Sequence, residues 1–385
     1  MIFEPRTLGQ LSKTGRGYYG IGASAVPFSD DLFTYLRITD IRDDGTLNKS
    51  DLKSVADPEA RKYLLAPNDI VFARTGASTG RNYFYDGRDG TFVYAGFLIK
   101  FSIDESQVNP RYIKHYCRSK NYWDWVAAYN TGSTRGNINA QTLASMPIML
   151  PPREYQDRVV SILDSLDEKI ELNNRINENL ANQIQAIYSN EYDPVTHFPN
   201  GVLSDICVYS SVRIAVSDLS LSSYYSTENM LPNKAGAIDA ANLPSVSQTT
   251  KCHKGDVLIS NIRPYFKKIV YVTEECGCST DVLCFTPKGY YSQFLFSALY
   301  ADRFFDYMVA GSKGTKMPRG DKQQIMNYPL VIPSMESLAI FNGVVTPMLE
   351  QIASNRKENK SLETIRDTLL PKLMSDELDV SEVEL

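Results

Sequence analysis

Residues 147–180 read PIMLPPREYQDRVVSILDSLDEKIELNNRINENL, and residues 329–362 read PLVIPSMESLAIFNGVVTPMLEQIASNRKENKSL. The two segments align without a gap at a constant offset of 182 residues. The matched pairs are Pro147 and Pro329, Pro151 and Pro333, Glu154 and Glu336, Glu168 and Glu350, Ile170 and Ile352, Asn173 and Asn355, Asn177 and Asn359, and Leu180 and Leu362. Such a constant offset indicates an internal duplication, so the order along the chain is module, helix, module, helix.

Each copy carries an apolar seam that advances by four and three residues, the pattern of a coiled coil. Both seams have two asparagines near the middle, and a buried asparagine needs a polar partner. We therefore expect the helices to pack antiparallel about a pseudo-twofold axis, as a rod of roughly 50 Å, with the four amides meeting. The expected packing residues are Leu166, Ile170, Asn173, Asn177, Leu180, Met348, Ile352, Asn355, Asn359 and Leu362.

Pro347 interrupts the second seam. Proline lacks an amide hydrogen, and its ring collides with the preceding turn of a helix. We therefore expect the second helix either to begin near Thr346 or to kink there. The alternative interpretation of the two segments is a pair of unrelated amphipathic surface helices.

Charge is segregated between the modules and the helices. Residues 1–150 carry 18 Lys and Arg against 15 Asp and Glu, and residues 197–333 carry 13 against 11. The helical segments are acidic, with 4 against 9 in residues 151–196 and 5 against 10 in residues 334–385. A mild basic excess is compatible with a phosphate-binding face, but it does not by itself indicate nucleic-acid binding.

Composition limits the compartment and the chemistry. No apolar run reaches the roughly 18 to 20 residues that span a bilayer, and the first residues lack a signal-peptide core, so we expect a cytoplasmic protein. Among six cysteines, Cys276 and Cys278 with His253 and Cys284 form a weak metal candidate, but buried apolar cysteines are the favoured interpretation. We therefore expect no metal site. No Cys or Ser nucleophile has a recognisable base in the sequence, so we expect no catalytic residue either.

The two modules share an order of elements that predicts an α+β fold. We expect buried strands within residues 68–76 and 254–263, further strands at 94–101 and 282–287, helical stretches at 110–128 and 292–310, and Gly-Ser loops at 131–137 and 310–316. Tyr35–Ile41 alternates like a strand before a turn at Asp43-Asp44-Gly45, as in a hairpin. The predicted domains are modules at 1–150 and 193–333, helices at 151–192 and 334–375, and an acidic tail at 376–385.

Two loops of the first module are candidates for binding. Residues 74–81 combine two arginines with small residues, and residues 131–137 place Arg135 between two glycines. Backbone donors and guanidinium groups together suit the approach of a phosphate and the recognition of guanine. Solvated turns that use glycine only for its backbone freedom are an equally good interpretation of these loops.

The chain resembles the specificity subunits of type I restriction-modification systems. In the first half, YLRITDI (35–41), DIVFARTGAS (69–78) and YAGFLI (94–99) are similar to a target recognition domain of that family. LPPREYQ (150–156) and ILDSLDEKIELNNRINENL (162–180) resemble its central conserved helix. The second half shows only GDVLIS (255–260) and GSKGT (311–315), and it has Asn261 where the first half has Arg74.

The resemblance implies a non-catalytic subunit whose two recognition domains each read half of a bipartite DNA target. In that family the paired helices set the unread gap and carry two modification subunits, which methylate adenine with S-adenosylmethionine. Restriction subunits that use ATP and Mg can join them. The implied DNA contacts are Arg74, Thr75, Ser78, Arg81, Ser133, Arg135, Asn137, Asn261, Arg263, Lys313, Lys316 and Arg319.

Two other functions remain open from the sequence. One is the specificity subunit of a related type II restriction enzyme, which only the neighbouring genes would distinguish. The other is a coiled-coil scaffold without a DNA role, which the absence of a basic face on both modules would favour.

Overall fold

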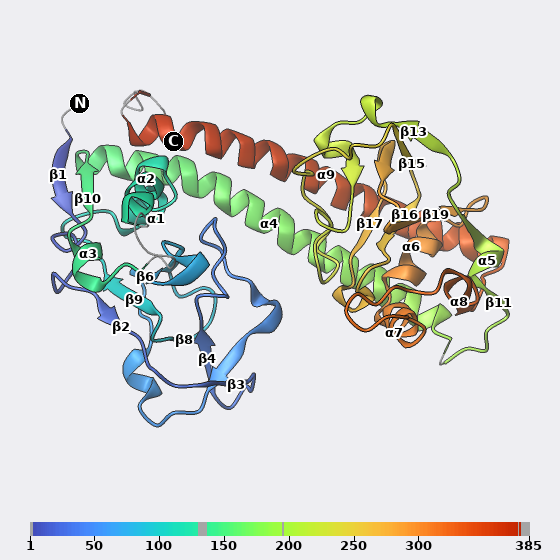
Figure 1. The fold of residues 1–385 in the computed structure, drawn as a ribbon, viewed down its shortest axis with the longest axis horizontal. Coiled ribbons are helices and arrows are strands. Elements are labelled where there is room, and N and C mark those ends of the chain that lie inside the picture. Colours follow the sequence, from blue (N-terminus) through green and yellow to red (C-terminus); the bar gives the residue numbers. More distant parts are fainter. Residues whose placement is uncertain (1–2, 130–136, 195, 376, 379–385) are drawn as a thin grey trace. The chain divides into compact units, whose positions relative to one another are not determined.

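The structure is a computed structural model that describes residues 3–129, 137–194, 196–375 and 377–378. Its contacts divide the chain into two compact units, Met1–Ile170 with Lys360–Leu385, and Glu171–Asn359. Each unit contains one mixed module and adjacent parts of two long helices, α4 (Arg153–Tyr192) and α9 (Met335–Met374), drawn green and red in Figure 1. The α+β class with two long helices is confirmed, whereas the domain boundaries stay a prediction.

The described part of the first unit has a central sheet, a second sheet and a strand pair. The central sheet has the order β2 (Tyr18–Tyr19), β9 (Leu98–Ser102), β6 (Asp69–Ala73), β7 (Asn82–Tyr85). The second has the order β3 (Ala25–Pro27), β5 (Lys53–Val55), β4 (Phe33–Leu36), β8 (Phe92–Tyr94), and β1 (Glu4–Thr7) pairs with β10 (Pro147–Leu150). The helices are α1 (Pro110–Tyr116), α2 (Lys120–Tyr129) and α3 (Ala140–Ala144).

The second unit repeats this plan. Its central sheet has the order β12 (Cys207–Tyr209), β19 (Val282–Pro287), β16 (Val257–Ser260), β17 (Ile269–Tyr271). The second sheet has the order β13 (Arg213–Ala215), β15 (Gln248–Cys252), β18 (Cys276–Cys278), β14 (Tyr224–Tyr225), and β11 (Gly201–Val202) pairs with β20 (Pro329–Leu330). The short helices are α5 (Leu203–Ile206), α6 (Ser292–Tyr300), α7 (Asp302–Ala310) and α8 (Lys322–Met326).

The central strands β6 and β16 lie inside the cores of their units. Every residue of both strands is buried, and each strand is paired on both sides. The long helices complete each core: in the first unit Val159 and Leu163 of α4 and Leu370 of α9 belong to the same apolar cluster as β6. Removing either helix would therefore expose the core that holds the sheet.

Three local predictions are wrong in detail. The expected strand at residues 35–41 ends at Leu36, because the buried Asp40 carboxylate accepts from the Arg37 amide at 2.8 Å and from its guanidinium at 2.6 Å. This side chain closes a turn that the alternating pattern did not reveal. The helical stretch 110–128 is split into α1 and α2, and 292–310 into α6 and α7, with Ala301 extended between the last two.

The long helices pack antiparallel through their seam asparagines in the second unit. Asn173 Nδ2 donates to Asn359 Oδ1 at 2.8 Å, and Asn355 Nδ2 donates to Asn177 Oδ1 at 2.9 Å. The predicted meeting of the four amides is confirmed. In the first unit Arg366, which breaks the apolar pattern, donates from Nη1 to Asp167 Oδ1 of α4 at 3.2 Å.

The apolar packing residues follow the same seam. Ile352 is buried, and Leu180 and Met348 pack against the core cluster of the second unit. Leu166, Ile170 and Leu362 are half-buried in the first unit. No helix in the described part of the chain is apolar enough over a sufficient length to cross a membrane.

Pro347 neither begins α9 nor splits it, so the predicted start near Thr346 is wrong, whereas the predicted kink stays a prediction. The helix begins at Met335, and Pro347 lies within it on an exposed position. Gly343, whose carbonyl loses its helical donor, is exposed as well, so water can replace the missing amide hydrogen. The buried neighbours Val345 and Leu349 hold the turn against the core.

Candidate nucleic-acid interface

In the first unit, the loop that follows β6 is held between two other loops. The Arg74 amide donates to the Phe97 carbonyl at 3.1 Å, and the Ile138 amide donates to the Arg74 carbonyl at 2.9 Å. Thr75 forms an isolated β-bridge with Asn137. The structure therefore brings together Arg74, Thr75 and Asn137, three of the predicted contact residues.

The Arg74 side chain is oriented by an aromatic ring. Its guanidinium carbon lies 5.0 Å from the centre of the Tyr19 ring, in a cation–π contact. Its Nε is buried and finds no hydrogen-bond acceptor among the described residues. Tyr19 and Phe97 beside it are 42% and 57% exposed. An oriented arginine with an unused donor beside an exposed ring can bind a ligand that supplies an acceptor.

Arg81 and Ser78 stabilise the same loop from within. Arg81 Nε donates to Asp43 Oδ1 at 2.6 Å and Nη2 donates to Asp43 Oδ2 at 3.2 Å, a two-pronged ion pair. The Ser78 carbonyl accepts from the Arg81 amide at 2.9 Å. Gly80 is required here, because its φ is +90° and a Cβ would lie 2.7 Å from Val126 Cγ1. Arg81 is thus engaged by Asp43, and its DNA contact stays a prediction.

The Gly-Ser loop of the first unit is only partly described. Ser133 and Arg135, two of the predicted contact residues, lie outside the described residues. Asn137, the last residue of that loop, is exposed and joined to Thr75 through the backbone. The described end of the loop therefore lies at the same place as Arg74.

The second unit builds a similar loop after β16. The Arg263 amide donates to the Pro318 carbonyl at 2.8 Å, and Ile262 forms a β-bridge with Arg319. Arg263 has a φ of +51°, an uncommon value for a residue with a side chain. Among the described residues its buried Nε finds no acceptor, and Oδ1 of the buried Asn261 finds no donor. Strained backbone and unused polar atoms gather where the sequence predicts contacts.

Lys313 and Arg319 form a hairpin beside this loop. Their backbones exchange hydrogen bonds of 2.9 and 3.0 Å. Lys313 Nζ lies 2.6 Å from Asp321 Oδ2, and Arg319 Nη2 lies 2.9 Å from Asp281 Oδ1. Lys316 is exposed at the tip of the hairpin. The structure therefore places Asn261, Arg263, Lys313 and Arg319 together, although the side chains of Lys313 and Arg319 are already paired with carboxylates.

Exposed aromatic residues were missed by the sequence prediction. In the second unit Tyr265 and Phe266 follow Arg263 directly, are 49% and 38% exposed, and have ring centres 4.7 Å apart. In the first unit Tyr18 and Tyr19 come from a distant strand, and Phe97 comes from the β8–β9 connection. Aromatic residues interleaved with arginines could have indicated Tyr265 and Phe266, whereas only the fold brings Tyr19 to Arg74.

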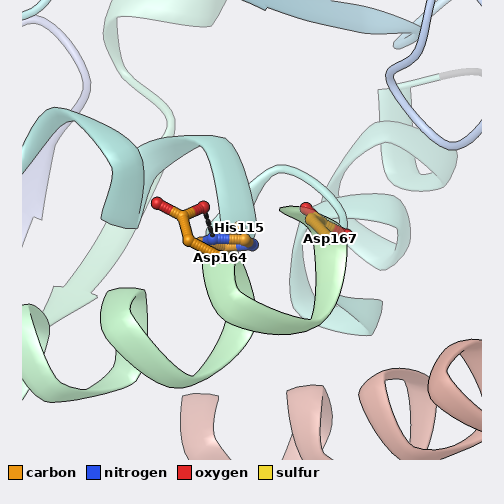
Figure 2. Close-up of side chains that lie close together, drawn as sticks. All are labelled: His115, Asp164 and Asp167. Carbon is orange, nitrogen blue, oxygen red and sulfur yellow. Dashed lines mark hydrogen bonds and ion pairs between the residues drawn. The ribbon is translucent and has the colours of Figure 1, made fainter. Parts of the chain in front are cut away.

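A second polar cluster lies where α1 meets α4 in the first unit. His115 of α1 faces Asp164 and Asp167 of α4, with His115 Nε2 2.9 Å from Asp164 Oδ1 (Figure 2). The ligand atoms of these three residues lie within 4.8 Å of one another, as in a metal site. The cations around them are Arg111, Lys114, Arg118 and Arg366, at 2.6 to 3.2 Å from the two carboxylates.

These cations make the cluster an ion-pair network and a poor site for a metal ion. Burial alone would raise the pKa of Asp164, but the hydrogen bond from His115 and the charges of Lys114 and Arg111 outweigh it, so this pKa lies well below its usual range. Burial lowers the pKa of His115 to about 4, so its ring is neutral at pH 7. Positive groups already occupy the carboxylate oxygens that a cation would need.

Comparison with known proteins agrees with these features. Residues 33–182 match the type I restriction modification DNA specificity domain. The chain is 24% identical over 315 residues to the type I restriction enzyme MjaIX specificity subunit of Methanocaldococcus jannaschii, covering 73% of this chain and 72% of that protein. It is 20% identical over 411 residues to the HindI specificity subunit of Haemophilus influenzae, covering 83% and 89%.

The fold also has a counterpart among solved structures. The crystal structure of the type I restriction-modification S subunit from M. genitalium superposes with a TM-score of 0.55, covering 96% of each chain at 17% identity. This likeness concerns the fold, whereas the sequence match in residues 33–182 concerns the domain family. Residues 33–182 thus carry a type I restriction modification DNA specificity domain, and most of the chain is similar to specificity subunits of type I restriction enzymes.

Proposed function

We propose that this chain is the DNA-reading subunit of a type I restriction-modification complex, in which each unit reads one half of a bipartite target. The observation that carries the proposal is one arginine in each unit, Arg74 and Arg263, whose buried Nε finds no acceptor in the described part of the chain. Both follow the buried central strand of their unit, and exposed aromatic side chains flank both. The duplicated loops thus offer the same chemistry twice.

An arginine held in this way suits the recognition of a base edge. A guanidinium fork matches the two acceptors that guanine presents in the major groove, and a good bidentate contact contributes roughly 1–3 kcal/mol of discrimination. Holding the fork before binding reduces the conformational entropy that is lost in the complex. Lysine and arginine residues on the hairpin 313–319 would contact phosphates, which position the protein without reading sequence.

Partner subunits would carry out the chemistry. Two modification subunits would methylate adenine with S-adenosylmethionine, and restriction subunits with ATP and Mg would cleave, while this chain makes and breaks no bonds. The complex would act in the cytoplasm, where foreign DNA enters. The acidic helices α4 and α9 would carry the modification subunits and, through their length, set the gap between the two half-sites.

Sequencing of methylated adenines tests this proposal. The gene would be expressed with its modification subunit in a host that lacks adenine methylation, and a bipartite methylated motif is expected. Arg74→Ala should relax or abolish one half of the motif, and Arg263→Ala the other. Arg61→Ala and Lys254→Ala change exposed cations of the two units at other places and should leave the motif unchanged.

Two results would contradict the assignment. Methylation that is independent of this gene would exclude the reading function. A loss of the same half of the motif in both arginine variants would exclude one reader per unit, even if the chain directs methylation.

A further inference from the structure

Four of the six cysteines gather in one apolar cluster of the second unit. Cys252 lies on β15, Cys276 and Cys278 lie on β18, and Cys284 lies on β19, and all four are buried. In the antiparallel pair of β15 and β18, Cys252 is the direct partner of Cys276. Cys278 is two residues further along the same strand and therefore points to the same face of the sheet. Strand pairing thus directs three thiols to one place, and Cys284 joins them in the same cluster.

The first unit has a positive charge at the corresponding place. Its buried Asp69 lies 3.1 Å from Lys100 Nζ, and Lys100 pairs with Val71 in the ladder of β6 and β9. In the second unit, Leu258 is the counterpart of Val71, and it pairs with Cys284. Cys284 therefore takes the position of Lys100. The duplicated sheet therefore has a thiol where its other copy has an ammonium group.

The buried carboxylate is nevertheless retained in the second unit. Asp256, the counterpart of Asp69, is 1% exposed, and its Oδ2 accepts from the His253 amide at 2.9 Å. The same oxygen lies 3.2 Å from Cys284 Sγ. Among the described residues, the ion-pair contact of Asp256 is His253 Nδ1 at 4.0 Å. The cluster therefore combines an acidic group and four soft donors without a close permanent cation.

We propose that Cys252, Cys276, Cys278 and Cys284 bind one Zn²⁺ ion. Four thiolates in a tetrahedral set are one of the common ligand sets of structural zinc, and such sites are closed to water, as a buried cluster is. Each thiol that binds releases its proton to solvent, so four protons leave as four Zn–S bonds form. Asp256 Oδ2, which accepts from the Cys284 thiol before binding, would lie beside the ligand set and keep its hydrogen bond from the His253 amide.

The four thiols are close neighbours in this cluster. The thiol of Cys252 interacts with those of the other three cysteines, which come from two further strands. The thiolate is the form that ligates metal. In the described part of the chain, only His115, Asp164 and Asp167 form a group of three with all ligand atoms within 4.8 Å of one another. The four sulfurs are therefore further apart than in a metal site, and binding would draw them together by rotation about χ1.

The competing explanation is a set of thiols that only fill apolar space. The chain provides matched controls, since Cys117 and Cys207 are equally buried but belong to other clusters. A metal site predicts that loss of a cluster cysteine has a consequence that loss of these two does not have. Packing alone predicts no metal in any variant.

Metal content and cobalt substitution of the full chain test the proposal. The chain would be purified with reductant, stripped with a chelator and titrated anaerobically with Zn²⁺ or Co²⁺. We expect about one equivalent of tightly bound zinc by mass spectrometry, and sulfur-to-cobalt charge-transfer absorption with the pattern of a tetrahedral site. Cys117→Ser and Cys207→Ser should keep both signals, whereas Cys252→Ser and the double variant Cys276→Ser/Cys278→Ser should lose them.

A further variant separates metal binding from folding. Cys284→Lys installs the ammonium group of the first unit beside Asp256, so it should fold, as judged by circular dichroism, and bind less than a tenth of an equivalent of zinc. Absence of zinc and of the cobalt bands in the wild-type chain would overturn the proposal. Equal zinc content in the wild-type chain and in the cluster variants would overturn it as well.

Discussion

The two units share a sheet order but attach their modules to the long helices by different forces. In the first unit, α1 meets α4 through His115 and three basic residues that face Asp164 and Asp167. In the second unit, α6 meets α4 and α9 through aromatic rings, with Phe294 between Tyr188, Tyr192 and Phe341. Duplication has preserved the backbone plan while the chemistry of each junction changed. Two units with the same fold can therefore differ in how their stability depends on pH, salt and packing.

The aromatic junction should be the more sensitive to truncation. Phe294 is fully buried, with ring centres 5.2 to 5.8 Å from Tyr192, Tyr188 and Phe341. Phe294→Ala removes a whole ring and leaves a cavity, which typically costs about 3–5 kcal/mol. Urea denaturation followed by far-UV circular dichroism should show this loss.

Tryptophan fluorescence shows whether the loss is confined to the second unit. The two tryptophans of the chain, Trp123 and Trp125, both lie in the first unit, so their transition should move far less than the dichroism. Phe198→Ala removes a ring that is 97% exposed and should change neither transition. Equal shifts of both probes in Phe294→Ala would mean that the units unfold together and that the comparison does not extend to their stability.

The ionic junction should respond to the loss of one charge. Asp164→Asn keeps the shape of the side chain but removes the carboxylate that lies 2.6 Å from Arg111 and 3.1 Å from Lys114. Breaking a largely buried pair costs about 3 kcal/mol, somewhat less here because Arg111 is a third exposed. The tryptophan transition in urea should shift accordingly. Asp124→Asn, which loses an exposed pair with Lys120, should change the free energy of unfolding by less than about 0.5 kcal/mol. An equal effect of the two variants would contradict a stabilising role of the ion pairs between α1 and α4.

Acid should weaken the first unit. Burial lowers the pKa of His115 to about 4, against about 6.5 in an unfolded chain. Between these values the unfolded chain binds a proton that the folded chain does not, so the free energy of unfolding falls as the pH falls, by on the order of 2 kcal/mol. Below about pH 4 the loss continues, because the unfolded chain protonates Asp164, whose pKa in the fold is far lower despite its burial.

The metal-stripped second unit should respond in the opposite direction. Burial raises the pKa of Asp256 to about 7, against about 3.9 in an unfolded chain. Here the folded chain binds the proton, so the free energy of unfolding should rise as the pH falls through this range, by on the order of 2 kcal/mol. Urea titrations between about pH 7 and 4.5 should move the tryptophan and dichroism transitions apart, and Asp256→Asn should abolish the rise. Parallel movement of the two probes would contradict the assignment.

The sequence predicted the parts of this architecture that depend on periodicity. Apolar spacing and the paired asparagines were sufficient for the two long helices, their direction and the contact of Asn173 with Asn359. The break at Ala301 and the turn closed by Asp40 each depend on a single residue, and a periodic pattern does not reveal them. Proline was given too much weight at Pro347, because the exposure of that turn could not be known before the packing.

The candidate site was predictable only where its residues are close in sequence. Arg74 and Arg263 stand out next to their strands, but Tyr19 reaches Arg74 from 55 positions away and only through the order of the sheet. The same holds for the thiol cluster, since Cys252 lies on a strand apart from the CGC sequence and was not included in the weak metal candidate. Pairings between distant strands are set by tertiary packing, which a local pattern does not contain.

The smallest expected effect lies in the seam, where the first unit pairs Asp167 with Arg366 and the second pairs amides. Asn355→Ala leaves Asn177 Oδ1 without its donor, which should cost about 1 kcal/mol. Replacing both residues by Leu restores a matched seam, so the double variant should regain most of that loss.

A double-mutant cycle measured by dichroism in urea isolates this amide pair. The coupling energy between Asn177 and Asn355 should be about 1 kcal/mol, whereas the exposed pair of Asn179 and Gln183 on α4 should show almost none. A coupling close to zero at the seam would mean that the amides contribute nothing to stability and serve only to fix the register, because any other register would bury them opposite apolar side chains. In that case Asn177→Leu/Asn355→Leu should be more stable than the wild-type chain, and the apolar seam alone would account for the strength of the packing.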